Sequence, residues 1–84
     1  MNHLDNKVMR HLLRFCTFDE NGTLIANPYY SAIHRVRFKG KLITLKSLHF
    51  YYLHGAFPQG KLVDSSGENK IVDSSLLTYI PNGV

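Results

Sequence analysis

The sequence predicts a single α+β domain, and three observations support this expectation. Apolar residues recur at helical spacing near the N-terminus, as in Leu4, Val8 and Leu12. Polar and apolar residues alternate over 34–39, which is the period of a β-strand, and Asn-Gly and Lys-Gly pairs indicate tight turns. A chain of 84 residues has room for one modest core, so we expect one domain over 1–84.

The first half of the chain predicts a helix and then two hairpins. The helix is expected over 2–15, with Asn2 as its N-cap and Asp5 in the first turn, where a carboxylate suits the helix dipole. Residues 17–25 predict two short strands joined by a turn at Asn21-Gly22. The second hairpin is expected to run from Ala32 through a turn at 39–41 to a return strand over 42–45.

The second half predicts a short helix followed by two paired strands. The helix is expected over 46–54, and Gly55 ends it in the left-handed conformation. A strand over 61–64 is expected to pair with 70–73 across a polar loop. Ser74 or Ser75 is then expected to cap a final turn that runs to Tyr79.

Composition narrows the cellular setting and the partners. The net charge is +4, which suits a polyanionic partner without requiring one. Cys16 is the only cysteine, so an internal disulfide is excluded and a reducing cytoplasm is the simpler setting. No apolar run approaches the roughly 20 residues that span a bilayer, and the N-terminal segment has no long apolar stretch, so we expect neither a membrane partner nor export.

A row of basic residues indicates a candidate nucleic-acid interface. Arg35, Arg37 and Lys39 recur at period two, on the strand face opposite Val36 and Phe38. Three neighbouring charges of the same sign repel one another, which favours an anionic partner, although a solvated sheet face is also commonly charged. The other basic residues that we assign to DNA binding are Lys41, Lys46, Lys61 and Lys70.

The first helix carries a further set of basic residues. Lys7, Arg10 and Arg14 lie along one side of it. They are expected either to add contacts to a DNA backbone or to form the ordinary solvated face of the helix.

Three stretches in the second half resemble phage HNH homing endonucleases. They read RVRFKGKLITLKSL, then HGAFPQGKLVDSSGEN, then KIVDSSLL. The most specific of them is HGAFPQGKLVD, whose glycines, proline and aspartate have the spacing found in that family. The segment LLRFCTFDENGTLI also resembles the leading segment of the family, so the resemblance covers roughly residues 8 to 77.

The resemblance implies a ββα unit that holds one divalent metal ion, but most of its chemical groups are missing. Asp64 stands at the position of a metal-binding aspartate, whereas Ser65 stands where a histidine acts as general base. Asn69 is the nearest match to a loop asparagine, and Leu76, or Ser75 if the gap falls later, replaces the asparagine of the helix. Because a serine hydroxyl is not a useful base near neutral pH, we expect a degenerate ββα unit with no catalytic residue, no metal and no cofactor.

The function expected from these features is DNA binding without cleavage. We expect a repressor of a phage or phage satellite that occupies an operator in double-stranded DNA in the bacterial cytoplasm, with a homodimer as one way to read a longer site. This step rests on analogy with the family. Two alternatives are an interaction protein that inhibits a host or defence protein through an apolar patch at 50–52, and a residual nuclease with a metal site at Asp64, Glu68 and Asp73.

Overall fold

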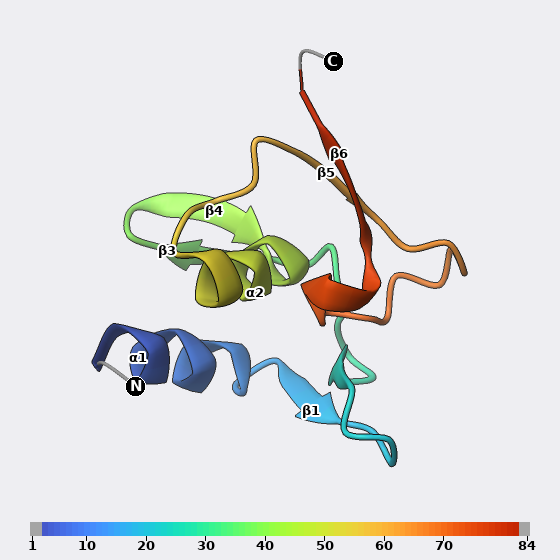
Figure 1. Cartoon of the computed structure of the whole chain (residues 1–84). Helices are drawn as coiled ribbons and strands as arrows, with labels where there is room; N and C mark the ends of the chain where they lie inside the picture. The colour runs from blue at the N-terminus through green and yellow to red at the C-terminus, as the bar shows by residue number, and fades with distance from the viewer. Residues whose placement is uncertain (1–2, 83–84) are drawn as a thin grey trace.

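The fold combines two helices with three pairs of antiparallel strands (Figure 1). The computed structural model describes residues 3–82, and the side chains of 3–6 lie outside the description. In chain order, the elements of this range are α1 (His3–Leu12), β1 (Cys16–Phe18), β2 (Leu24–Ala26), β3 (Arg35–Phe38), β4 (Lys41–Thr44), α2 (Leu45–His54), β5 (Gly60–Val63), a 3-10 turn (Ser74–Leu76) and β6 (Thr78–Pro81). The predicted α+β class is confirmed.

Helix α1 buries its apolar stripe inside the domain. Val8 and Leu12 are both almost fully buried in the core beneath α2, so this stripe packs internally. The helix ends at Leu12 instead of Phe15, because the chain turns there and the amide of Phe15 donates to the carbonyl of Leu12 at 3.0 Å. This turn brings Cys16 into the core as the first residue of β1. The expected N-cap, Asn2, lies outside the described residues.

The first two hairpins and the second helix form where local sequence signals predict them. The Asp19 carboxylate accepts hydrogen bonds from the amides of Asn21 and Thr23, both at 2.9 Å, and thereby closes the β1–β2 turn. Between β3 and β4, Lys39 and Gly40 both have positive φ, at 51° and 76°, as a two-residue hairpin turn requires. The expected 39–41 turn is therefore confirmed.

Helix α2 has a defined cap at each end. The Thr44 side chain accepts from the Ser47 amide at 3.2 Å, which satisfies one of the free N–H groups of the first turn. Gly55, at φ 75°, ends the helix, and its amide donates to the Tyr51 carbonyl at 2.8 Å. The expected helix and its glycine stop are confirmed, with Leu45 as the first helical residue.

The segment 70–73 does not pair with β5, which corrects the expected strand pair. It lies along β2, with Ile71 opposite Ile25, and the amide of Val72 donates to the carbonyl of Leu24 at 3.0 Å. Val72 is fully buried in the core. Burial of this side chain against β2 fixes the partner of the segment, whereas pairing with β5 would carry it away from the core.

Strand β5 instead pairs with β6, in the register Gly60 to Pro81 through Val63 to Thr78. The expected final turn is a single 3-10 turn capped by Asp73, whose carboxylate accepts from the Ser75 amide at 3.1 Å, and not by Ser74 or Ser75. In the ββα unit expected from the resemblance, β5 and β6 would be the two strands. No helix follows β6 within 3–82, so the described residues do not contain the helix of such a unit.

The close approach at Gly60 gives a test of the β5–β6 pairing. A Cβ at this position would overlap the backbone carbonyl of Ile80 and would lie 2.8 Å from the Pro81 Cα. Gly60→Ala should therefore separate the two strands at this end and lower the free energy of unfolding by about 1–3 kcal/mol. Thermal unfolding and faster amide exchange in β5 and β6 would measure the effect, with the exposed Gln59→Ala as the control. Unchanged exchange in both strands would contradict the pairing.

Candidate nucleic-acid interface

The β3–β4 ribbon has an outer face that carries two arginines. Cross-strand partners share a face, so Arg35 lies beside Thr44, and Arg37 lies beside Leu42. Both arginines are exposed, and Leu42 is 60% exposed between them. The inner face carries Val36, which is buried in the core. The expected separation of the arginines from the apolar face is therefore present.

Lys39 does not belong to this basic row, which corrects the expected period-two pattern. The left-handed turn directs its ammonium group toward α2, where Nζ donates to the Tyr51 hydroxyl at 2.8 Å. The same Nζ lies 5.2 Å from the centre of the Tyr51 ring and 5.9 Å from that of Phe38. The alternation of a strand does not extend into a turn, so the row consists of Arg35 and Arg37.

Lys41 and Lys46 are also held by contacts within the fold. Lys41 is the partner of Phe38 in the register, and its Nζ lies 5.2 Å from the centre of the Phe57 ring. Lys46 donates from Nζ to the backbone carbonyl of Leu62 at 2.6 Å, which links α2 to β5. Lys46 therefore has a structural role, and cation–π contacts with Phe38, Tyr51 and Phe57 partly engage Lys39 and Lys41.

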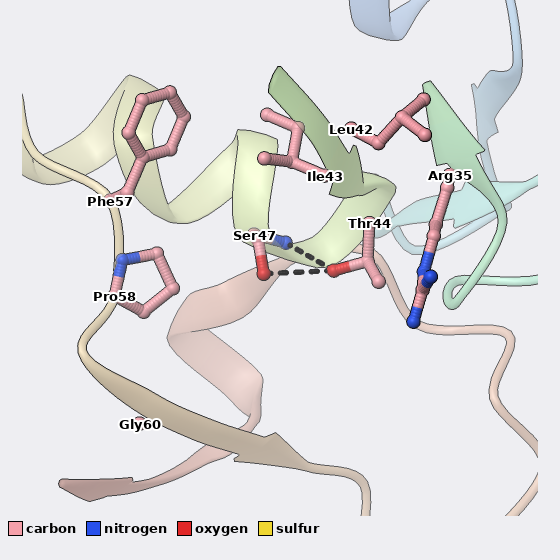
Figure 2. A pocket seen from close by; sticks show the side chains of 8 residues that line it. All are labelled: Arg35, Leu42, Ile43, Thr44, Ser47, Phe57, Pro58 and Gly60. Atoms are coloured by element: carbon pink, nitrogen blue, oxygen red, sulfur yellow. Dashed lines mark hydrogen bonds between the residues drawn. The ribbon is translucent and has the colours of Figure 1, made fainter. Parts of the chain in front are cut away.

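Arg35 lies at the rim of a hollow between the ribbon and the segment that leads into β5 (Figure 2). The hollow has a volume of about 250 Å³, and its lining also includes Phe57 and Pro58. Thr44 and Ser47 lie on its helix side, where the Thr44 hydroxyl donates to Ser47 Oγ at 2.8 Å. Its lining combines one unpaired cation with an apolar wall.

The remaining assigned lysines lie at the other end of the chain. Lys61 is exposed on β5, and its backbone partner is Ile80 of β6. Lys70 is exposed as well, and its carbonyl accepts from the Ala26 amide at 2.9 Å. Neither side chain forms an ion pair with Asp64 or with the other carboxylates described in 7–82.

Asp64 organises the loop that follows β5. Its Oδ1 accepts from both the amide of Ser66 at 2.9 Å and the hydroxyl of Ser66 at 2.8 Å. These two hydrogen bonds, with smaller effects from the Asn69 amide and the Lys46 charge, hold the pKa of Asp64 below its usual value. Ser65 is exposed, and Asn69 adopts φ 55°, so the three positions expected to be catalytic remnants form a closed turn.

No three metal-ligating side chains gather anywhere in the described range, so Asp64, Glu68 and Asp73 do not form the metal site of the residual-nuclease alternative. Asp73 instead binds the Ser75 amide and hydroxyl, the latter at 2.6 Å. Cys16 is buried, and burial raises the pKa of its thiol to about 11, which leaves almost no reactive thiolate near neutral pH.

His49 is a buried histidine that lies beside a serine and an aspartate, but the three do not form a catalytic triad. Its Nδ1 accepts from the Ser74 amide at 3.0 Å and lies 3.2 Å from Ser74 Oγ and 3.8 Å from Asp73 Oδ1. In a triad the serine and the carboxylate engage opposite nitrogens of the ring, whereas both are near Nδ1 here. His49 thus connects α2 to the 3-10 turn.

A second basic surface lies on α1, where the sequence gives only an ambiguous signal. A hollow of about 190 Å³ is lined, among the side chains described in 7–82, by Lys7, Arg10, His11 and Arg14. The ring of His11 lies 6.0 Å from that of Phe38, so this hollow adjoins the inner side of the β3–β4 ribbon. The spacing of three and four residues identifies the stripe, but only the tertiary structure shows that it encloses a hollow beside β3.

Four of the five acidic residues described in 7–82 lie in two loops away from α1. Asp19 and Glu20 lie in the β1–β2 turn, and Asp64 and Glu68 lie in the loop after β5. In Figure 1 these two segments lie at the right of the molecule, whereas α1 and the β3–β4 turn lie at the left. The one contact of opposite charge type among the described side chains is between His49 and Asp73, and none of them pairs a lysine or arginine with a carboxylate, so the exposed cations of 7–82 have no carboxylate partner there.

The apolar patch expected at 50–52 is not an exposed surface. Tyr51 is only 8% exposed, and Phe50 packs against Tyr79 with ring centres 5.1 Å apart. The interaction-protein alternative therefore cannot use this segment as a flat patch.

Comparisons with known proteins give no assignment, because no family model, no curated protein and no solved structure matches the chain. No helix in the described residues is long and apolar enough to span a membrane.

The buried position of His49 predicts a pH-dependent stability. Burial lowers the pKa of His49 below its usual 6.5, opposed by the Asp73 charge and reinforced by that of His54. The unfolded chain therefore binds a proton more readily, so stability is full above the unfolded pKa and falls as pH drops through it. His49→Asn keeps an acceptor near the Nδ1 position and should reduce the loss of stability between about pH 7.5 and 5. Chemical unfolding at several pH values measures the free energy of unfolding of both proteins. Equal dependence of this free energy on pH in the wild type and in His49→Asn would contradict the role of His49.

Proposed function

We propose that this protein binds double-stranded DNA without cutting it and acts by occupying its site. The observation that carries the proposal is the set of exposed cations that have no carboxylate partner within 7–82, on α1 and on the outer face of the β3–β4 ribbon. A two-stranded ribbon of this kind fits the major groove or lies along the phosphate backbone. Lys61 and Lys70 add exposed charge near the degenerate site.

The sequence resemblance gives the proposal its concrete form. An HNH homing endonuclease recognises a DNA site, and this chain lacks the general base and the helix asparagine that the resemblance requires for cleavage. Such a scaffold would serve as a phage or phage-satellite repressor that occupies an operator, and a homodimer would extend the site that it reads. This part of the proposal rests on family analogy.

An interaction protein is a second candidate, favoured by the apolar surface at the C-terminal end of the fold. Leu76 is 58% exposed and Ile80 is 50% exposed, and every residue of β6 is exposed. If this surface is the functional one, Leu76→Ser with Ile80→Ser would abolish capture of a protein partner without changing DNA affinity.

The DNA proposal predicts that the two outer-face arginines contribute directly to affinity. Arg35→Ala with Arg37→Ala should weaken binding of a fluorescent duplex by roughly tenfold or more and lower the salt exponent by about 1.8, since each lost phosphate contact contributes about 0.9. Fluorescence anisotropy over a salt series, with magnesium present, measures both quantities, and the same samples run on a gel report cleavage.

Asp64→Asn is the matched control, because it keeps the Oδ1 acceptor of the loop and should leave DNA affinity at the wild-type level or slightly above. Equal losses in the arginine and Asp64 variants would disprove the assignment to the ribbon. Absence of binding by the wild-type protein at low salt would disprove the DNA function itself, and cleaved product would show that the protein is a nuclease.

A further inference from the structure

Every described side chain that lines the hollow on α1 is basic. Lys7, Arg10 and Arg14 are exposed, and His11 is half-buried between them. Residues three and four positions apart are neighbours on a helix surface, where like charges repel each other. Solvated helix faces usually mix both signs, so a concave surface with four basic side chains, and no acidic one among the side chains described in 7–82, is electrostatically unfavourable until an anion occupies it.

The helix dipole accounts for only part of this arrangement. Positive charge near the C-terminus of a helix is favourable, and Arg10 and His11 lie in the last turn of α1. Lys7 lies one turn earlier, and Arg14 lies in the turn beyond the helix. The dipole therefore does not explain why all four side chains border the same hollow.

His11 supplies an independent observation. Its ring is held between aromatic neighbours, 5.9 Å from the Phe15 ring and 6.0 Å from the Phe38 ring, centre to centre. Its Nε2 is buried and has no hydrogen-bond partner among the residues that the structure describes. A buried polar atom without a partner is costly, so an acceptor beside this ring would lower the free energy of the site.

We propose that the α1 hollow is a binding site for a phosphate group. Arginine guanidinium groups offer planar pairs of donors that match phosphate oxygens, and Lys7 adds a mobile ammonium donor. A tetrahedral phosphate accepts from several directions at once, which suits donors that surround a hollow. The phosphate comes either from a DNA backbone or from a free phosphate monoester, and the DNA source rests on the function proposed above.

The position of the hollow relative to the ribbon follows from one ring contact. The His11–Phe38 contact places the hollow at the inner side of β3, whereas Arg35 and Arg37 lie on the outer face of the same strand. Phosphate contacts fix the register and orientation of a protein on a duplex, whereas base contacts carry sequence information. In the proposed complex the α1 hollow holds a phosphate of the DNA backbone, and the outer-face arginines of the ribbon remain available for other contacts with the DNA.

The direct test is a titration of ¹⁵N-labelled protein with inorganic phosphate at constant ionic strength, followed by amide chemical shifts. Saturable shifts should concentrate at residues 7–14, and Arg10→Gln with Arg14→Gln should weaken binding by about tenfold or more. Asn21→Asp with Gln59→Glu lowers the net charge by the same two units at exposed positions away from the hollow, and it should retain binding. Weak shifts over the whole surface, or equal losses in both variants, would overturn the proposal.

A second titration with a DNA duplex distinguishes the source of the phosphate. If the backbone occupies the hollow, the duplex should displace inorganic phosphate, and Arg10→Gln with Arg14→Gln should lower the salt exponent of DNA binding by about 1.8. Phosphate binding without duplex binding supports the site as one for a free phosphate monoester and disproves the proposed DNA function alone. Duplex binding that leaves residues 7–14 unperturbed overturns the phosphate site and leaves the DNA function in place.

Discussion

The pairing of the segment 70–73 with β2 is the constraint on which the rest of the fold depends. Backbone hydrogen bonds join Ala26 to Lys70 and Leu24 to Val72 and Asp73, and the amide of Ala32 donates to the Asn69 carbonyl. These contacts connect residues more than 35 positions apart in the sequence, and Val72 fills the core between them. Closing so long a loop costs conformational entropy, which burial of apolar surface must offset.

Three features of the fold follow from this pairing. Because the segment 70–73 pairs with β2, β5 pairs with β6. The exposed side chain of Ile80 lies on β6, and the exposed side chain of Leu76 lies in the 3-10 turn just before it. The same pairing delivers Ser74 to α2, where its amide meets His49. The loop between β5 and the segment 70–73 is short, and Asp64 closes it through Ser66. Asp64 Oδ1 accepts hydrogen bonds from both the amide and the hydroxyl of Ser66.

The sequence predicts local structure well because local chemistry determines it. The turn at Lys39-Gly40 and the end of α2 at Gly55 depend on left-handed backbone that few residues adopt, so their sequence signals are direct. Strand partners are different, since the β-branched residues Ile71 and Val72 indicate a strand without identifying the strand that it pairs with. The predicted position of Lys39 on the face of Arg35 and Arg37 is wrong for a related reason. The alternation of side chains applies only within the strand, and a residue of the turn can direct its side chain to the opposite side. The spacing of the basic residues identifies the stripe on α1, but the contact of His11 with Phe38 depends on tertiary packing that this spacing does not contain.

The internal contacts of the lysines decide which cations remain for an external anion. Lys46 is tied to the Leu62 carbonyl, and Lys39 and Lys41 lie over aromatic rings, so these three stabilise the fold at the junction of the ribbon with α2. The arginines differ, because neither the outer face of β3 nor the α1 hollow offers them a carboxylate or a ring among the described contacts. Arginine is the cation whose donor geometry best matches phosphate, and all four arginines of the chain lie on these two surfaces. The four exposed arginines, more than the net charge of +4, are the physical argument for the proposed anionic partner.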